Sequence, residues 1–219
     1  MIRTEPLANG SIALVDNVCT FGTDAVLLSE FAAVRNTDRV CDLGTGCGII
    51  PLLWYDAGLT PTVDAVELST TAAALCRAAV EQNGLSDHIT VWEQDWRALT
   101  LPAGAYDTVV CNPPYFPQGS GKVSAHPDRR LARHETATTL QDVLAAARRL
   151  LKVGGHFCFC HRPERLSDVM ITLREQGLSP ARLQWVHARP DSSPFLFLCD
   201  AVKGGHPQLI TLPPHILEK

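Results

Sequence analysis

Short apolar runs alternate with stretches of helical periodicity along most of this chain of 219 residues. Runs rich in Val, Cys, Phe and Leu that end at polar residues or glycine predict buried strands. Seven such strands are predicted, at residues 39–43, 63–67, 88–92, 108–111, 156–160, 182–187 and 195–202, with a short additional one at 12–15. Helices are predicted at about 24–34, 47–56, 70–82, 140–151 and 163–176. This order predicts an α/β fold with a seven-stranded, mostly parallel sheet, an antiparallel final strand and helices on both faces.

The composition is that of a globular protein with a substantial core. Hydrophobic residues make up 46% of the chain and charged residues 19%, so a disordered chain is excluded. The length predicts one domain over 1–219, in which 1–37 form an N-terminal extension and helix. No apolar run reaches the ~18 residues needed to span a membrane, and the N-terminus lacks a signal core. We expect a cytoplasmic monomer with no membrane partner.

Eight cysteines are spread along the chain, mostly within apolar runs where a free thiol acts as a small hydrophobe. They include no Cys-x-x-Cys pair, so neither a disulfide framework nor a zinc site is expected. His156, Cys158, Cys160 and His161 lie close together in the sequence, but they fall in a predicted buried strand and no second pair of ligands has zinc-type spacing. We therefore predict no metal.

A glycine-rich loop, Gly44-Thr45-Gly46-Cys47-Gly48, separates the strand at 39–43 from the next helix. Glycines let a ligand approach the backbone, and the N–H groups of a helix N-terminus face it. The dinucleotide fingerprint Gly-x-Gly-x-x-Gly requires glycine at position 49, which is Ile49 here. The pattern predicts a nucleotide-type site without pyrophosphate recognition; an ordinary strand–helix turn is the alternative.

Two acidic residues follow the next two strands. Glu67 lies 23 positions after Gly44, near the spacing of about 20 expected for an acid that binds ribose hydroxyls. Asp95 and Trp96 follow the third strand, where an adenine amine and ring would lie. The alternatives are a solvated loop acid for Asp95 and a core aromatic for Trp96.

The fourth strand ends abruptly at Asn112-Pro113-Pro114-Tyr115. Consecutive prolines cannot continue a sheet ladder, and they hold the preceding residue extended. The resulting corner presents an amide side chain, free carbonyls and an aromatic ring. These groups suit a planar group with an NH2, whose hydrogens the Asn112 oxygen and a proline carbonyl accept while Tyr115 stacks on its face. A proline-rich surface turn is the alternative.

Charge is unevenly distributed about the net value of −4. Residues 116–165 hold nine basic and four acidic residues, a balance of +5, which leaves −9 for the remainder. We expect residues 116–138 to form a mobile basic loop that contacts substrate. Its proposed RNA-binding residues are Lys122, Arg129, Arg130 and Arg133.

Together, the segment Asp42–Gly48, Glu67, Asp95 and Asn112–Tyr115 make the chain resemble class I methyltransferases that use S-adenosylmethionine (SAM). The chain is most similar to the bacterial tRNA (valine) adenine-N6 methyltransferase family, through flanking segments such as Thr23–Leu28 and Ala132–Glu135 as well. The resemblance implies a Rossmann-like fold and N6-methylation of adenine in a tRNA anticodon loop. It implies catalysis by Asn112, Pro113, Pro114 and Tyr115. It implies SAM binding by Thr23, Asp42, Gly44, Thr45, Gly46, Gly48, Glu67, Leu68, Asp95, Trp96 and Asn112.

Two other functions stay open. Methyltransferases that act on glutamine amides of proteins share the Asn-Pro-Pro-Tyr corner, but they carry an extra N-terminal helical domain, and only about forty residues precede the glycine loop here. A SAM-binding or RNA-binding module without turnover is the second possibility, and the intact corner argues against it.

Overall fold

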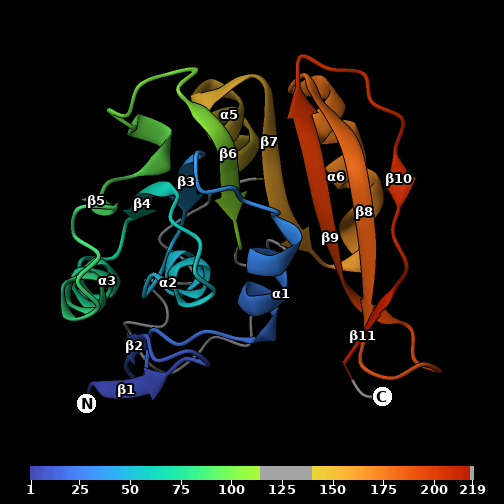
Figure 1. Cartoon of the computed structure of the whole chain (residues 1–219). Helices are drawn as coiled ribbons and strands as arrows, with labels where there is room; N and C mark the ends of the chain where they lie inside the picture. The colour runs from blue at the N-terminus through green and yellow to red at the C-terminus, as the bar shows by residue number, and fades with distance from the viewer. Residues whose placement is uncertain (114–139, 218–219) are drawn as a thin grey trace.

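The central element is a twisted sheet, seen in a computed structural model that describes residues 1–113 and 140–217 (Figure 1). Its seven long strands lie in the order β5-β4-β3-β6-β7-β9-β8. Their bounds are β3 Arg39–Leu43, β4 Thr62–Glu67, β5 Ile89–Glu93, β6 Tyr106–Cys111, β7 Leu151–His161, β8 Leu178–His187 and β9 Pro194–Lys203. Only β9 runs antiparallel to its neighbours in this set. The predicted seven-stranded sheet with an antiparallel final strand is confirmed.

Two very short strands extend the sheet beyond the prediction. β10 (Ile210–Thr211) and β11 (His215–Ile216) both pair in parallel with β8 at the outer edge. Strands of two residues carry no measurable alternation of polar and apolar positions. The sequence pattern could not have indicated them.

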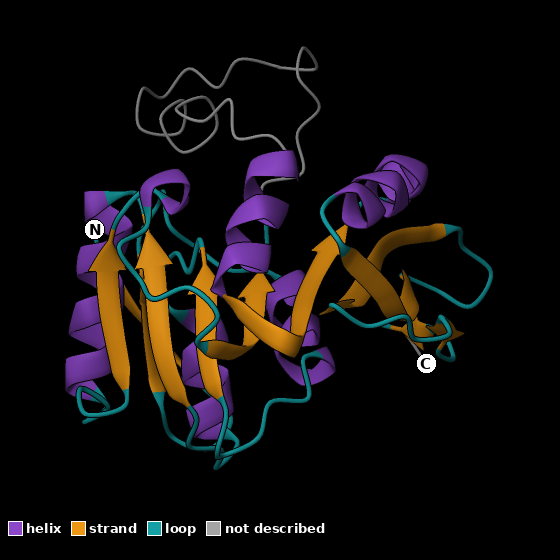
Figure 2. Cartoon of the chain, turned by 90° about the horizontal axis from the view of Figure 1, so that it is seen from above, coloured by secondary structure: helices purple, strands orange, loops and turns teal. Residues whose placement is uncertain are grey.

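Helices cover both faces of the sheet, as predicted (Figure 2). One face is covered by α1 (Thr23–Phe31), α2 (Ile49–Asp56) and α3 (Thr70–Gln82), the other by α5 (Leu140–Leu150) and α6 (Leu166–Glu175). Each face has its own apolar cluster. Successive residues of β7 alternate between them: Cys158 and Cys160 pack on the first, Phe157 and Phe159 on the second.

The N-terminal segment forms a hairpin of β1 (Arg3–Pro6) and β2 (Ile12–Val15). The predicted strand at 12–15 is therefore present, and its apolar residues Ala13, Leu14 and Val15 are buried in the first cluster. The side chain of Asn83, which ends α3, accepts from Ile12 N at 2.9 Å and donates to Ile12 O at 2.8 Å. These bonds fasten the hairpin beneath the helix layer.

Three predicted boundaries differ from the structure. Helix α1 spans Thr23–Phe31 rather than the predicted 24–34, with Gly22 at its N-cap and no side-chain capping bond. Helix α2 begins at Ile49, two residues later than predicted, because Gly48 adopts a left-handed φ of 81°. Strand β7 begins at Leu151 rather than at the predicted residue 156, and its first part, which contains Gly154 and Gly155, crosses a register shift against β6.

Candidate active site

The residues singled out from the sequence gather at one edge of the sheet, where the carboxyl ends of β3, β4, β5 and β6 meet. β3 lies between β4 and β6. The chain leaves β3 toward β4 on one side and later returns to β6 on the other. In open α/β sheets, ligands bind at such a switch point, beyond the carboxyl ends of the strands.

The backbone path of the glycine loop requires glycine at positions 44, 46 and 48. Gly44, Gly46 and Gly48 all have positive φ, at 74°, 59° and 81°. A Cβ at Gly48 would lie 2.5 Å from the Cys76 sulfur, and one at Gly44 would lie 2.9 Å from Cζ3 of Trp96. The loop can therefore follow this path only without side chains at these positions.

Asp42, at the end of β3, is completely buried beneath the loop. Its Oδ2 accepts a hydrogen bond of 2.7 Å from the Thr45 hydroxyl. Burial raises the pKa of Asp42 to about 7; the Thr45 bond opposes this shift and the negative charge of Glu67 adds to it. Near neutral pH this carboxyl is thus poised to change its charge when a cation or a donor arrives.

Glu67, at the end of β4, bonds to the glycine loop through its carboxylate. Oε2 accepts from Gly46 N and Oε1 accepts from Ser69 N, both at 2.8 Å. Each oxygen keeps a further lone pair for a ligand hydroxyl. Leu68, the next residue, is largely exposed.

Asp95 and Trp96 lie after β5 at the start of a short 3₁₀ turn (Trp96–Ala98). Asp95 is engaged by Arg97, whose Nη2 lies 2.6 Å from Oδ2, and this partner holds the pKa of Asp95 below its usual value. The Trp96 ring packs against Gly44 and the second apolar cluster. Trp96 thus joins the end of β5 to the glycine loop.

Unsatisfied buried groups concentrate at this edge. In the described residues, three buried side-chain atoms have no hydrogen-bond partner: Asp42 Oδ1, Trp96 Nε1 and Arg39 Nε. Two of the three border the glycine loop. Since leaving such atoms unpaired costs free energy, an acceptor beneath the loop and a donor beside it fit a bound polar ligand.

Asn112 follows β6 immediately, and its Oδ1 lies 3.2 Å from the Cys160 sulfur, which donates to it. Cys160 belongs to β7, where the register pairs Cys111 with Phe159 and so brings the next two residues together. The sequence prediction missed this partner, although the adjacency of the fourth and fifth strands would have indicated it. Pro113 is buried directly after Asn112.

One predicted residue begins a helix, and several others fall outside the described residues. Thr23 is exposed as the first residue of α1. The predictions for Pro114, Tyr115, Lys122, Arg129, Arg130, Arg133 and the loop 116–138 fall on residues that the structure does not describe.

Neither a metal centre nor a membrane-spanning helix is found in residues 1–113 and 140–217. No group of three or more His, Cys, Asp or Glu side chains in these ranges has a metal-binding arrangement. All eight cysteines are free thiols, seven of them buried. None of the helices in these ranges is long and apolar enough to cross a bilayer.

The fold and the glycine loop at its switch point define a class I methyltransferase. A predicted O-methyltransferase of Agrobacterium tumefaciens superposes with a TM-score of 0.67 at 22% identity, over 89% of this chain and 88% of that one. A geranyl diphosphate methyltransferase in complex with SAM superposes with a TM-score of 0.61 at 15% identity, over 83% and 84% of the two chains. At these identities the likeness concerns the fold.

Residues 17–172 match the methyltransferase small domain, and the chain belongs to this family. A relative from Aeromonas salmonicida is 39% identical over 156 residues, 69% of this chain and 63% of its own length. A relative from Parabacteroides distasonis is 31% identical over 176 residues, 79% of this chain and 72% of its own. Both relatives are named tRNA1(Val) (adenine(37)-N6)-methyltransferase. This chain thus matches slightly less than two thirds of the first relative.

Proposed function

We propose that this protein transfers a methyl group from SAM to the N6 amine of an adenine in RNA. The substrate we infer is adenine 37 of a valine tRNA, the one for which both relatives are named. The observation that carries the reaction type is the place of Asn112. Its amide follows β6 directly, beside the glycine loop, and is held by a donor from the adjacent strand. A tRNA substrate implies action in the cytoplasm.

The cofactor would be held by the groups that border the glycine loop. Asp42 Oδ1 and Trp96 Nε1 supply a buried acceptor and a buried donor without partners in the described residues. Glu67 supplies carboxylate lone pairs suited to ribose hydroxyls. Gly46, having no side chain, leaves the backbone accessible to a ligand, whereas Gly44 makes room for the Trp96 ring beside the loop. Thr23, Gly48, Leu68 and Asp95 stay candidates for cofactor contacts.

The cofactor supplies an electrophilic methyl group on a sulfonium, which needs an aligned nitrogen lone pair. The Asn112 oxygen and the Pro113 carbonyl accept hydrogen bonds from the target amine. These bonds favour a pyramidal nitrogen whose lone pair faces away from both acceptors. Cys160 fixes the direction of the Asn112 oxygen, so the acceptor does not reorganise as the amine arrives.

No strong base is required from the protein. The amine becomes acidic as it is methylated, and its proton passes to water. We expect Tyr115 to stack on the base, which must leave its own stack to enter the site. We expect Lys122, Arg129, Arg130 and Arg133 to contact RNA phosphates, so neutralising them would weaken binding and reduce its salt dependence.

The proposal is tested by methyl transfer from labelled SAM into tRNA that lacks the modification, followed by nucleoside identification. Asn112→Ala should lower turnover by at least ~100-fold, the scale of losing one preorganised hydrogen-bonding group, while SAM still binds. Asn36→Ala, in an exposed turn where the side chain accepts from Thr60 N, is the matched control and should keep full activity. Near-normal turnover in Asn112→Ala would contradict the assignment. If labelled SAM instead methylates glutamine in proteins and leaves tRNA unlabelled, the substrate is protein glutamine rather than tRNA.

A further inference from the structure

A cavity of about 390 Å³ lies at the opposite edge of the sheet from the glycine loop. It is lined by the segment that follows α1, by the first residues of β6 and β7, and by Arg182 of β8. Thr108, which lines it, and Asn112 are separated by most of the length of β6, about 13 Å at the usual rise of a strand. The cavity is thus separate from the proposed active site, and its volume falls in the range of small-ligand sites.

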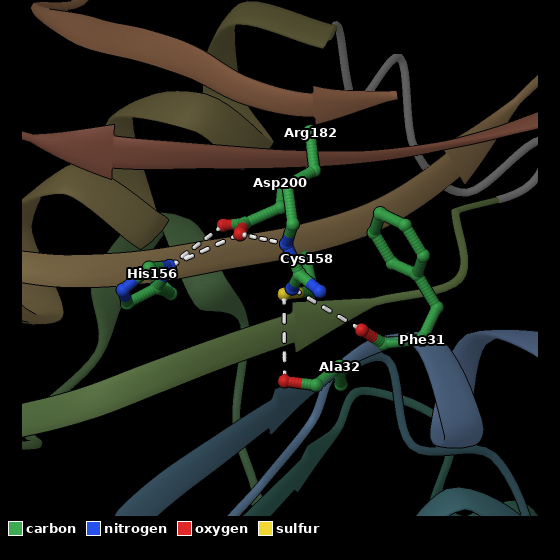
Figure 3. Close-up of polar contacts among 6 residues, drawn as sticks. All are labelled: Phe31, Ala32, His156, Cys158, Arg182 and Asp200. Atoms are coloured by element: carbon green, nitrogen blue, oxygen red, sulfur yellow. Dashed lines mark hydrogen bonds and ion pairs between the residues drawn. The ribbon is translucent and has the colours of Figure 1, made fainter. Parts of the chain in front are cut away.

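Four basic side chains line this cavity, and each is paired with an aspartate. Arg35 pairs with Asp38 at 3.1 Å, and Lys152 pairs with Asp107 at 2.7 Å. His156 and Arg182 share Asp200, at 2.9 Å and 2.8 Å (Figure 3). Asp38 and Asp200 are 5% and 1% exposed, whereas Arg35, Lys152 and His156 are about half exposed or more. Asp200 therefore lies beneath the cavity, whereas Asp38 and the partly exposed Asp107 line it together with the four basic groups.

The acids use their lone pairs on groups within the protein. Asp38 Oδ2 also accepts from Arg35 N at 3.0 Å, and Asp107 Oδ2 accepts from Arg39 N at 2.9 Å. The basic groups, by contrast, have N–H groups that make no hydrogen bond within the described residues. Among hydrogen bonds within residues 1–113 and 140–217, the Arg35 side chain donates only through Nε, and the His156 ring uses only Nδ1. The terminal nitrogens of Arg35 and Nε2 of His156 remain for a ligand.

The backbone around the cavity is held in an unusual conformation. Ala33, which lines it, has a φ of 50°, the only positive value for a non-glycine residue in the described ranges. The two residues before it are anchored to the sheet: Arg182 Nη2 donates to Phe31 O at 3.3 Å, and the Cys158 sulfur lies 4.0 Å from Ala32 O (Figure 3). Such strain persists where the surroundings over-determine a residue, and it is common at ligand sites. Gly154, which also lines the cavity, leaves open space where a side chain would stand.

We propose that this cavity is an anion site that binds a phosphate group through Arg35, Lys152, His156 and Arg182. With His156 neutral, three positive charges face three negative ones, giving zero, and protonation of His156 gives +1. The hydrogen bond that His156 donates to Asp200 raises the pKa of His156, although burial and the nearby Arg182 and Arg35 oppose this. A bound phosphate adds negative charge and would favour the protonated ring further. Guanidinium groups suit phosphate because they present paired donors in one plane.

The first experiment titrates the full chain with inorganic phosphate and follows the imidazole resonances by NMR near pH 6.5. His156→Gln identifies which of the eight histidine signals belongs to His156. We expect that signal to shift with a millimolar Kd and toward the protonated form. Sodium acetate at equal ionic strength, which lacks the tetrahedral set of acceptors, should shift it at least fivefold less. A His156 signal that does not respond to phosphate overturns the proposal.

The double variant Arg35→Gln/Lys152→Gln removes the donors and leaves the paired acids in place, since Asp38 and Asp107 keep their backbone partners. Phosphate binding should weaken at least tenfold. Arg77→Gln is the matched control, a half-exposed arginine on α3 that is also paired with an acid, Glu93, at 3.5 Å. Equal phosphate affinity in the wild type and the double variant would also overturn the proposal. Methyl transfer does not enter this test, so the result is independent of the proposed activity.

Binding of tRNA to the same three proteins identifies the source of the phosphate. Weaker tRNA binding by the double variant, with Arg77→Gln unchanged, would assign the site to the RNA backbone. Unchanged tRNA binding, with phosphate binding lost, would assign it to a free phosphorylated molecule.

Discussion

Asp42 and Asp200 are both buried carboxylates of the same sheet, with 0% and 1% exposure, and their surroundings are opposite. Asp42 has one hydrogen-bond donor, the Thr45 hydroxyl, and one oxygen without a partner in the described residues. Asp200 receives bonds from Arg182 Nε at 2.8 Å and from His156 Nδ1 at 2.9 and 3.1 Å. Burial alone raises the pKa of both, but the bonds from His156 and Arg182 hold the pKa of Asp200 below its usual value, whereas that of Asp42 rises to about 7.

The difference separates two uses of a buried charge. Asp200 is completed by the protein itself and so contributes to the native structure. Asp42 lacks a partner for one oxygen within the described residues. A buried acid without its partners lowers stability, and a ligand that supplies the missing bond offsets this loss. The edge with unsatisfied groups is the one where the glycine loop, Glu67 and Asn112 also meet.

The largest effect is expected from Asp200→Asn. The amide cannot neutralise Arg182, which is left partly buried without its counter-charge, so the free energy of unfolding should fall by about 3–5 kcal/mol. Urea denaturation at pH 7 measures this. Asp168→Asn, which breaks the exposed pair with Arg165 at 2.8 Å, is the control and should cost about 0.5 kcal/mol or less. Similar losses in the two variants would mean that Asp200 is not a structural charge.

Asp42→Asn should raise the free energy of unfolding, whereas Asp200→Asn should lower it. Because the folded pKa is raised from 3.8 to about 7, the folded state favours the protonated carboxyl, and stability falls as pH rises from about 4 to about 7. The full shift corresponds to roughly 4 kcal/mol, and we expect about half of it after local relaxation. At pH 8 the asparagine variant should be about 2 kcal/mol more stable than the wild type, with little difference at pH 4. Its SAM affinity should fall. A variant that is less stable at pH 8 would show that Asp42 already has its partners.

Trp96→Phe tests the second unsatisfied atom beside the loop. The change removes an indole N–H that has no partner within residues 1–113 and 140–217, and it keeps an aromatic ring over Gly44. Loss of ring volume and relief of the buried donor should nearly cancel, so we expect stability to change by less than about 1 kcal/mol. Thermal unfolding without SAM measures the change in stability, and thermal unfolding with SAM measures the stabilisation by the ligand. SAM should raise the Tm less in the variant than in the wild type, whereas an equal rise would exclude the N–H from ligand binding.

His156→Gln should give the smallest effect and a characteristic pH dependence. The pKa of His156 is higher in the folded state than in the unfolded state, where it is 6.5. The ring therefore stabilises the fold fully at pH values below 6.5, and this stabilisation is lost as pH rises through the folded-state pKa. Since the ring is half exposed, we expect about 0.5 kcal/mol at pH 5.5 and close to zero at pH 9. Urea denaturation at the two pH values checks this. A loss that is equal at both would indicate packing rather than charge.

The order of strands and helices, and with it the α/β fold, could be predicted from the sequence because these elements follow local periodicity. Asp42 and Glu67 were placed at the ends of predicted strands, and Asp95 and Asn112 just after two others. Parallel strands bring their carboxyl ends to one edge. The family was likewise indicated by motifs that are contiguous in the chain. These features require no knowledge of which distant residues touch.

The features that sequence pattern could not supply all depend on contacts between strands. The bond from Cys160 to Asn112 requires the register of β6 and β7, and the overlap of Trp96 with Gly44 requires the path of the turn after β5. The cavity at the far edge joins residues from Ala32 to Arg182. His156 was considered only as a possible metal ligand, because its partner Asp200 is 44 residues away.

The anchoring of α1 sets a time scale for assembly during synthesis. The carbonyl of Phe31, at the end of α1, is held by Arg182, which is 151 residues later in the chain. At roughly 5–20 residues per second, a ribosome needs roughly 8–30 s to make that stretch. Helix α2, against which α1 packs, is made early in this interval, whereas β7, which also contacts α1, is made only toward its end and β9, a further contact, just after it. Part of the apolar face of α1 therefore stays uncovered until late in synthesis, and truncated forms that end before β7 should be captured by chaperones more than the full chain.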